Sequence, residues 1–84
     1  MNQDHCLVEQ FEMIFRAHFS SVKFFINMFL KSEADAEDLA QDVFVRLLDY
    51  KQMLRPDTVK YFLFTIARNI VTDYLRRYYK KQEV

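Results

Sequence analysis

Residues 57–81 read DTVKYFLFTIARNIVTDYLRRYYKK, and this stretch decides the fold. Its apolar residues recur at steps of three and four, which is the spacing of one face of an α-helix. The residues of this inward face are Val59, Phe62, Leu63, Ile66, Ala67, Ile70, Tyr74 and Tyr78. A stripe of this length predicts one long helix that packs on other helices.

The opposite face of the same helix combines aromatic rings with arginines and contains no acidic residue. Its members are Tyr61, Phe64, Thr65, Arg68, Thr72, Leu75, Arg76 and Tyr79. Rings offer flat faces on which nucleobases stack, and arginines offer contacts to phosphates, so the pattern is typical of a nucleic-acid surface. A helix that is partly covered within a larger assembly accounts for the pattern equally well.

Two further helices are predicted upstream, near residues 7–31 and 33–51. The inward face of the first is Leu7, Phe11, Ile14, Phe15, Phe19, Val22, Ile26 and Phe29. The inward face of the second is Ala36, Leu39, Ala40, Val43, Phe44, Leu47 and Tyr50. Ser32 is placed to cap this second helix, and Asp35 follows three residues later as in a capping box.

The outward face of the second helix places two apolar residues, Val45 and Leu48, inside a ring of acidic side chains. An apolar centre with a polar rim is the anatomy of a modest protein interface. Two isolated aliphatic residues on an ordinary surface would produce the same pattern.

Residues 51–58, KQMLRPDT, form the expected loop between the second and third helices. Pro56 disfavours helix at the residue before it, and the Asp-Thr pair after it can cap the third helix. Met53 and Leu54 are expected to tuck under the bundle. Further along, Asp73 falls near the buried face and needs a cationic partner, for which Arg77 is the first candidate and Arg46 the second.

Composition limits the chain to one small helical domain. With 84 residues it is a single domain, here expected to span 1–84, and nine Phe and five Tyr supply much of its core. The absence of Gly and the single Pro argue for long helices with few tight turns. The lone Cys excludes a disulfide framework and favours a reducing compartment. We therefore expect an all-α, compact bundle of three long helices in a cytoplasmic protein without a membrane span.

Charge is distributed unevenly although the chain is neutral overall. Residues 1–54 carry five basic and nine acidic side chains, a net of −4, whereas residues 55–84 carry seven basic and three acidic ones, a net of +4. This asymmetry suits two partners of opposite charge, but it also arises by chance in a chain this short.

The sequence offers no catalytic or metal-binding constellation. His5, Cys6 and His18 lack the recurrent Cys/His spacing of a zinc site, and a chain without Gly has no glycine-rich phosphate loop. We therefore predict neither a cofactor nor an enzymatic activity.

Two runs, AEDLAQDVFVRL at 36–47 and FLFTIARN at 62–69, are followed by Asp73 and the pair Arg76 and Arg77. In this order and spacing they resemble region 2 of bacterial RNA polymerase sigma factors of the extracytoplasmic-function type. The resemblance extends from about Phe11 to Arg77. The sequence departs from the family pattern at Phe62, where a Trp is usual. The family's second helical domain, which reads the upstream promoter element, is absent, so the chain is expected to be an excised domain.

The resemblance implies two partners and assigns residues to each. A coiled coil of the polymerase β′ subunit would be bound by Asp38, Gln41, Asp42, Val45, Arg46 and Asp49. The melted non-template strand of the minus-ten promoter DNA would be bound by Arg55, Lys60, Tyr61, Phe64, Arg68, Asn69, Arg76 and Arg77. Captured bases would enter a pocket walled by the loop at 51–58. An anti-sigma factor is a further candidate partner, because such proteins often cover both surfaces in this family.

Two alternatives come from other classes of protein. A helical adaptor that binds only protein explains the acidic face of the second helix but not the rings and arginines of the third. A helix-turn-helix reader of duplex DNA needs shorter helices and a tight turn, often with Gly, which this sequence does not contain.

Overall fold

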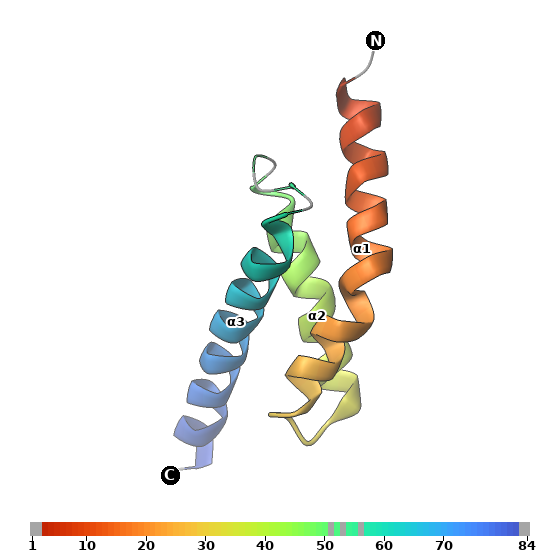
Figure 1. Cartoon of the computed structure of the whole chain (residues 1–84). Coiled ribbons are helices and arrows are strands. Elements are labelled where there is room, and N and C mark those ends of the chain that lie inside the picture. The colour runs from red at the N-terminus through yellow and green to blue at the C-terminus, as the bar shows by residue number, and fades with distance from the viewer. Residues whose placement is uncertain (1–2, 51, 53, 56, 83–84) are drawn as a thin grey trace.

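The computed structural model describes residues 3–50, 52, 54–55 and 57–82. The described residues form the helices α1 (Gln3–Asn27), α2 (Glu33–Leu47) and α3 (Val59–Gln82). The middle helix runs antiparallel to the other two, and the two ends of the chain lie at opposite ends of the molecule (Figure 1). The bundle is elongated, with extents of 56 × 20 × 20 Å. The predicted all-α fold with three long helices is confirmed.

The first helix ends four residues earlier than predicted. After Asn27 the backbone tightens, and the N–H of Phe29 donates to the carbonyl of Ile26 at 3.0 Å. The turn brings Leu30 into the core, whereas Phe29, which the periodicity placed inward, is 48% exposed. Because the chain has to reverse direction to pack α2 on α1, the burial of Leu30 overrides the continuing helical stripe.

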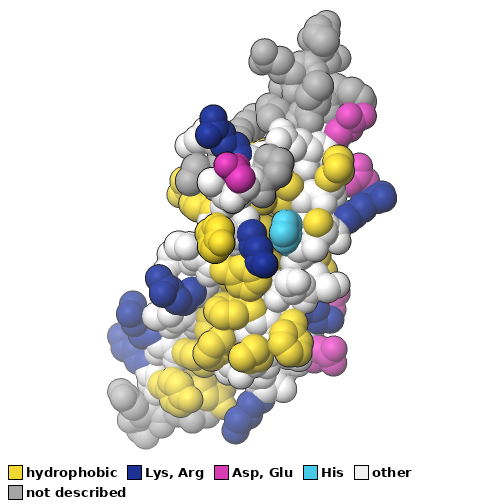
Figure 2. Space-filling model, viewed as in Figure 1, with side chains coloured by type: hydrophobic (Ala, Val, Ile, Leu, Met, Phe, Trp, Pro, Cys, Tyr) yellow, Lys and Arg dark blue, Asp and Glu magenta, His cyan; other side chains and the backbone are white. Residues whose placement is uncertain are grey.

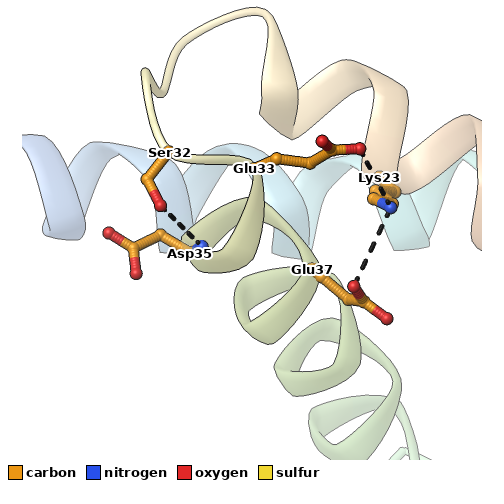
Figure 3. A network of polar contacts seen from close by, with 5 residues as sticks. All are labelled: Lys23, Ser32, Glu33, Asp35 and Glu37. Atoms are coloured by element: carbon orange, nitrogen blue, oxygen red, sulfur yellow. Dashed lines mark hydrogen bonds and ion pairs between the residues drawn. The ribbon is translucent and has the colours of Figure 1, made fainter.

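The start of α2 is defined by side-chain contacts (Figure 3). The Ser32 hydroxyl accepts a hydrogen bond from the N–H of Asp35 at 3.2 Å, which confirms the predicted cap. Lys23 of α1 lies between two acidic residues at the beginning of α2. Its Nζ is 3.7 Å from Glu33 Oε2 and 3.9 Å from Glu37 Oε1. These contacts tie the beginning of α2 to the last turns of α1.

Phe44 of α2 is the centre of an aromatic cluster in the core. Its ring centroid lies 5.0 Å from that of Phe15, with the two rings edge-on. The rings of Phe11 and Phe19 on α1 also contact it. Such edge-on pairs are favourable because the positive ring edge meets the negative ring face. The buried apolar residues are Ile14, Val22, Ile26, Leu30, Ala36, Ala40, Val43, Phe44, Leu47, Leu54, Val59, Leu63, Ile66, Ala67, Ile70 and Val71.

Several assignments to inward and outward faces were wrong. Tyr50 and Tyr78 were predicted inward but are exposed. Tyr50 follows the end of α2 at Leu47, so the periodicity of that helix no longer sets its direction, and Tyr78 lies in the last turns of α3. Phe64 and Leu75 were predicted outward but are partly buried against the core, and Val71 is buried although it lies off the predicted stripe. Helix α3 packs on both α1 and α2, so its buried face is wider than one stripe.

The loop before α3 is anchored from both sides. Leu54 is buried as predicted, and its carbonyl accepts a hydrogen bond from the side-chain amide of Gln10 on α1. The carbonyl of Arg55 accepts from the N–H of Val59 at 2.8 Å, which begins the turn that leads into α3. Met53, predicted to tuck under the bundle, and Pro56 lie outside the described residues, as do the side chains of residues 3–7.

No helix in the described part of the chain combines the length and the hydrophobicity that a membrane span requires.

Candidate nucleic-acid interface

A line of exposed side chains runs along α3 on the side away from the bundle. Its members, here called the crest, are Tyr61, Arg68, Thr72 and Arg76. They are spaced by seven and then four residues, so they lie along one side of the helix. Lys and Arg gather along the edge of the molecule that α3 forms (Figures 1 and 2). The crest therefore presents a ring and two guanidinium groups to solvent.

Three other residues assigned to DNA have different surroundings. The Phe64 ring packs edge-on against Phe25 of α1, with ring centroids 5.3 Å apart. Lys60 is exposed beside it, on the flank of α3 that faces α1. The Arg77 guanidinium pairs with Asp73 Oδ2 at 2.8 Å, which confirms the predicted partner. Because both of these side chains are largely exposed, the pair contributes little to stability.

A pocket of about 180 Å³ opens between the end of α2 and the first half of α3. The rings of Tyr50 and Phe62 form part of its wall, with centroids 5.1 Å apart and planes at 73°. The residues that line this α2–α3 pocket are Arg46, Tyr50, Phe62, Thr65, Ile66 and Asn69. It is several times the volume of a water molecule, which occupies about 30 Å³ in the liquid.

The α2–α3 pocket has the donors and acceptors that a flat heterocycle needs. The Arg46 guanidinium donates, and the Asn69 amide both donates and accepts. The Thr65 hydroxyl donates to the backbone carbonyl of Tyr61 at 2.9 Å, so its oxygen keeps acceptor capacity. With two aromatic rings beside these groups, the pocket can hold a base by its face and by its edge.

Sequence reasoning missed most of this pocket. Arg46 was grouped with the docking residues, and Tyr50 and Phe62 were placed on inward faces. A signal was nonetheless present in the sequence. Residues 48–58 join the two helices, so Tyr50, just after α2, and Phe62, in the first turn of α3, lie at the same end of the bundle. The polar residues beside those rings then line whatever space remains between the helices.

The docking residues assigned to the second helix are exposed, and all of them lie on α2 except Asp49, which follows the end of that helix at Leu47. Asp38, Gln41, Asp42 and Asp49 surround Val45, whose side chain is 61% exposed. These five residues are called the α2 face. Arg46 is also exposed but lies at the edge of this face that borders the α2–α3 pocket.

Tyr74 links α3 to the beginning of α2. Its hydroxyl donates a hydrogen bond to Asp35 Oδ2 at 2.8 Å. This hydrogen bond raises the pKa of Tyr74 above its ordinary value of 10.0, and desolvation and the Asp35 charge raise the pKa further. Asp35 thus contributes its backbone N–H to the α2 cap and its carboxylate to α3, rather than closing a reciprocal capping box.

The sequence of the chain is similar to those of known proteins. The profile of the family described as Sigma-70 region 2 matches residues 14–81. The chain is 33% identical over 67 residues to the ferric citrate uptake sigma factor FecI of Escherichia coli (strain K12). That alignment covers 80% of this chain and 39% of FecI, so the chain spans about two fifths of the length of this relative. No solved structure matches the chain significantly.

Proposed function

Because the chain belongs to the sigma-70 region 2 family, we propose that it recognises and melts the minus-ten promoter element as part of an RNA polymerase sigma factor. A role in transcription initiation follows from the family. The proposed mechanism combines non-template single-stranded DNA on α3 with a coiled coil of the polymerase β′ subunit on α2. The observation that carries this proposal is the α2–α3 pocket, which opens beside the crest and has the chemistry of a base-binding site.

In the proposed complex the non-template strand follows the crest. Tyr61 stacks on a base, and Arg68 and Arg76 contact phosphates, which gives affinity without sequence preference. One base leaves the stack and enters the α2–α3 pocket, where Arg46 and Asn69 contact its edge. Unstacking costs a few kcal/mol, and the stacking and hydrogen bonds inside the pocket offset that cost.

The α2 face is the proposed docking site for the β′ coiled coil. Its acidic residues suit a basic partner surface, and Val45 supplies an apolar centre. An anti-sigma factor that covers either surface would block polymerase or promoter binding. A helical adaptor that binds only protein would use the α2 face alone, and the crest and the α2–α3 pocket would then have no role in binding.

Fluorescence anisotropy with labelled oligonucleotides tests the nucleic-acid half of the proposal. We expect the chain to bind a single strand carrying the minus-ten element more tightly than a duplex of the same sequence. Tyr61→Ala should lower the affinity by roughly 1–3 kcal/mol at every salt concentration. Arg76→Ala should instead make the plot of log binding constant against log salt concentration less steep, by about 0.7 in slope. Arg16→Ala on α1 is the matched control and should change neither quantity; preference for duplex would contradict the proposal.

The pocket is tested by base preference. Arg46→Ala and Asn69→Ala should reduce discrimination at one position of the oligonucleotide, by about 1–3 kcal/mol between bases. Arg76→Ala should weaken all sequences equally. If the pocket variants kept full discrimination while Tyr61→Ala lowered affinity, strand binding would stand and base capture in this pocket would not.

Docking is tested with an immobilised β′ coiled-coil fragment. Asp42→Arg and Val45→Glu should reduce its capture of the chain, with the charge reversal acting chiefly on the association rate. Met13→Glu changes an exposed apolar residue of α1 and is the control for Val45→Glu. Capture that neither α2 variant reduces would assign docking to another face.

A further inference from the structure

A second hollow lies on the opposite flank of α3, against α1. It has a volume of about 580 Å³, and its lining residues are Ser20, Ser21, Phe24, Phe25, Met28, Lys60 and Phe64. Phe25 and Phe64, which line it, are partly buried and pack edge-on against each other. On its α1 wall, Phe24 and Met28 are 69% and 65% exposed. This hollow, here called the α1–α3 groove, takes no part in the crest, the α2–α3 pocket or the α2 face.

The apolar surface continues beyond the groove along the same flank of α3. Phe25 contacts the half-exposed Phe29 with ring centroids 5.3 Å apart. Phe29 in turn lines an adjoining hollow of about 360 Å³ whose other walls include Leu75, Tyr78 and Tyr79. Hydrophobic side chains form a continuous strip down the face shown in Figure 2. At 1.5 Å per residue, the α3 side of the strip, from Lys60 to Tyr79, is about 28 Å long.

The margins of this strip are basic. Lys60 lines the groove and Lys31 lines the adjoining hollow, while the other polar residues of the groove are serines. No acidic side chain lines the α1–α3 groove among the described residues. In the adjoining hollow the Asp35 carboxylate already accepts the hydrogen bond from Tyr74. The surface is therefore complementary to a binding partner that has an apolar stripe with negative charges beside it.

Shape and charge select among the possible occupants. A two-walled hollow of this length suits an amphipathic helix of about five turns, which lays an apolar face into a groove. A bilayer is flat and cannot fill the space between two helices. A second copy of the chain, docked by the same surface, would bring its own Lys60 and Lys31 against these lysines.

We propose that the α1–α3 groove binds an amphipathic helix of a partner protein, with apolar side chains against Phe24, Phe25 and Met28 and acidic side chains toward Lys60. Phe24 and Met28 were assigned to no DNA contact, so variants at these two residues test the groove apart from promoter binding, whereas Lys60 and Phe64 of the same groove were assigned to DNA from the sequence. It adds a third interaction surface to the molecule, beside the crest with its pocket and the α2 face.

The test uses two synthetic helical peptides of about 18 residues with the same leucine stripe. One has Glu at the positions that flank the stripe and the other has Lys. Isothermal titration calorimetry with the intact chain should show at least about tenfold tighter binding of the Glu peptide, which corresponds to 1.4 kcal/mol. Equal affinities, or no binding of the Glu peptide at millimolar concentration, would overturn the proposal.

Variants assign the binding to the groove. Met28→Glu should weaken the Glu peptide at least tenfold, whereas Met13→Glu, a change at another highly exposed methionine of α1, should not. Lys60→Glu should reverse or abolish the preference between the two peptides. Single-stranded DNA binding by Met28→Glu should match that of the unmodified chain, which separates the two proposals. A Glu peptide that binds Met28→Glu as tightly as the unmodified chain would place it elsewhere.

Two other experimental results would show that the α1–α3 groove binds something other than a partner helix. Light scattering that shows a dimer, with the dimer lost in Met28→Glu but retained in Met13→Glu, would assign the groove to a second copy. Co-flotation with anionic vesicles that shows the same dependence on Met28 would assign it to a membrane surface. A monomer that does not float with vesicles agrees with the helix proposal.

Discussion

Arg46 and Arg77 are both exposed arginines, and their neighbours give them different roles. The Arg77 guanidinium already pairs with Asp73 on the same helix, so part of its charge is compensated before any phosphate approaches. Arg46 instead borders a pocket that also contains Asn69. At the residue scale, the same side-chain type therefore serves helix pairing in one place and proposed base recognition in another.

Tyr74→Phe tests the hydrogen bond between α3 and the beginning of α2. Because the raised pKa of Tyr74 belongs to the folded state, its contribution to stability is complete below about pH 10 and is lost as pH rises through the folded-state value. We expect Tyr74→Phe to lower the free energy of unfolding by about 1 kcal/mol at neutral pH. The difference between the two proteins should shrink above about pH 10.

Urea unfolding followed by circular dichroism at several pH values measures this difference. Tyr79→Phe changes an exposed tyrosine and serves as the control. A stability difference between Tyr74→Phe and the unmodified chain that stays constant up to about pH 11 would rule out ionisation of Tyr74 as its cause.

At the scale of single elements, one face of α2 packs in the core and the opposite face is the proposed docking site. Ala36, Ala40, Val43, Phe44 and Leu47 are buried in the core. The acidic residues on the other side are exposed around Val45, so the proposed docking site is supported directly by the packed face. Because the helix is only 15 residues long, its ends contribute a large share of its stability.

Ser32→Ala tests how much the cap of α2 contributes. Loss of the hydroxyl removes the acceptor for the Asp35 N–H and should cost about 1 kcal/mol in the free energy of unfolding. Ser32→Asp keeps an acceptor and should retain most of the stability. Chemical denaturation of the three proteins checks this order, which would be wrong if the Asp variant were as unstable as the Ala variant.

At the scale of the whole molecule, a thin core carries two proposed partner surfaces and a groove. Phe44 of α2 is 2% exposed and packs against three rings of α1, while the first turns of α1 extend past the loop between α2 and α3 (Figure 1). The hydrogen bond from Gln10 to the carbonyl of Leu54 holds that loop against α1. The loop is therefore held by α1, and none of the described side chains of α1 lines the α2–α3 pocket.

Two Phe→Ala substitutions test this view of the core. Phe44→Ala should cost about 3–5 kcal/mol, a large part of the 5–15 kcal/mol that stabilises a typical domain. Phe24→Ala removes an exposed ring and should change stability by less than about 0.5 kcal/mol. Thermal unfolding followed by circular dichroism compares them, and equal losses would contradict the assignment of Phe44 to the centre of the core.

The sequence by itself determined the three helices, the cap at Ser32 and most of the core, because each depends on spacing along one chain segment; for Asp73 it left two candidate partners, and the structure shows the pair with Arg77. Helical periodicity gives the direction in which each side chain leaves the axis of its helix. It does not give the neighbouring helix or residue that the side chain meets in that direction. Only the tertiary structure decided that α1 ends at Asn27, that Phe64 packs against Phe25, and that Arg46 and Asn69 line the same pocket. Each of these depends on how two helices cross, and the crossing is set by packing across the whole core.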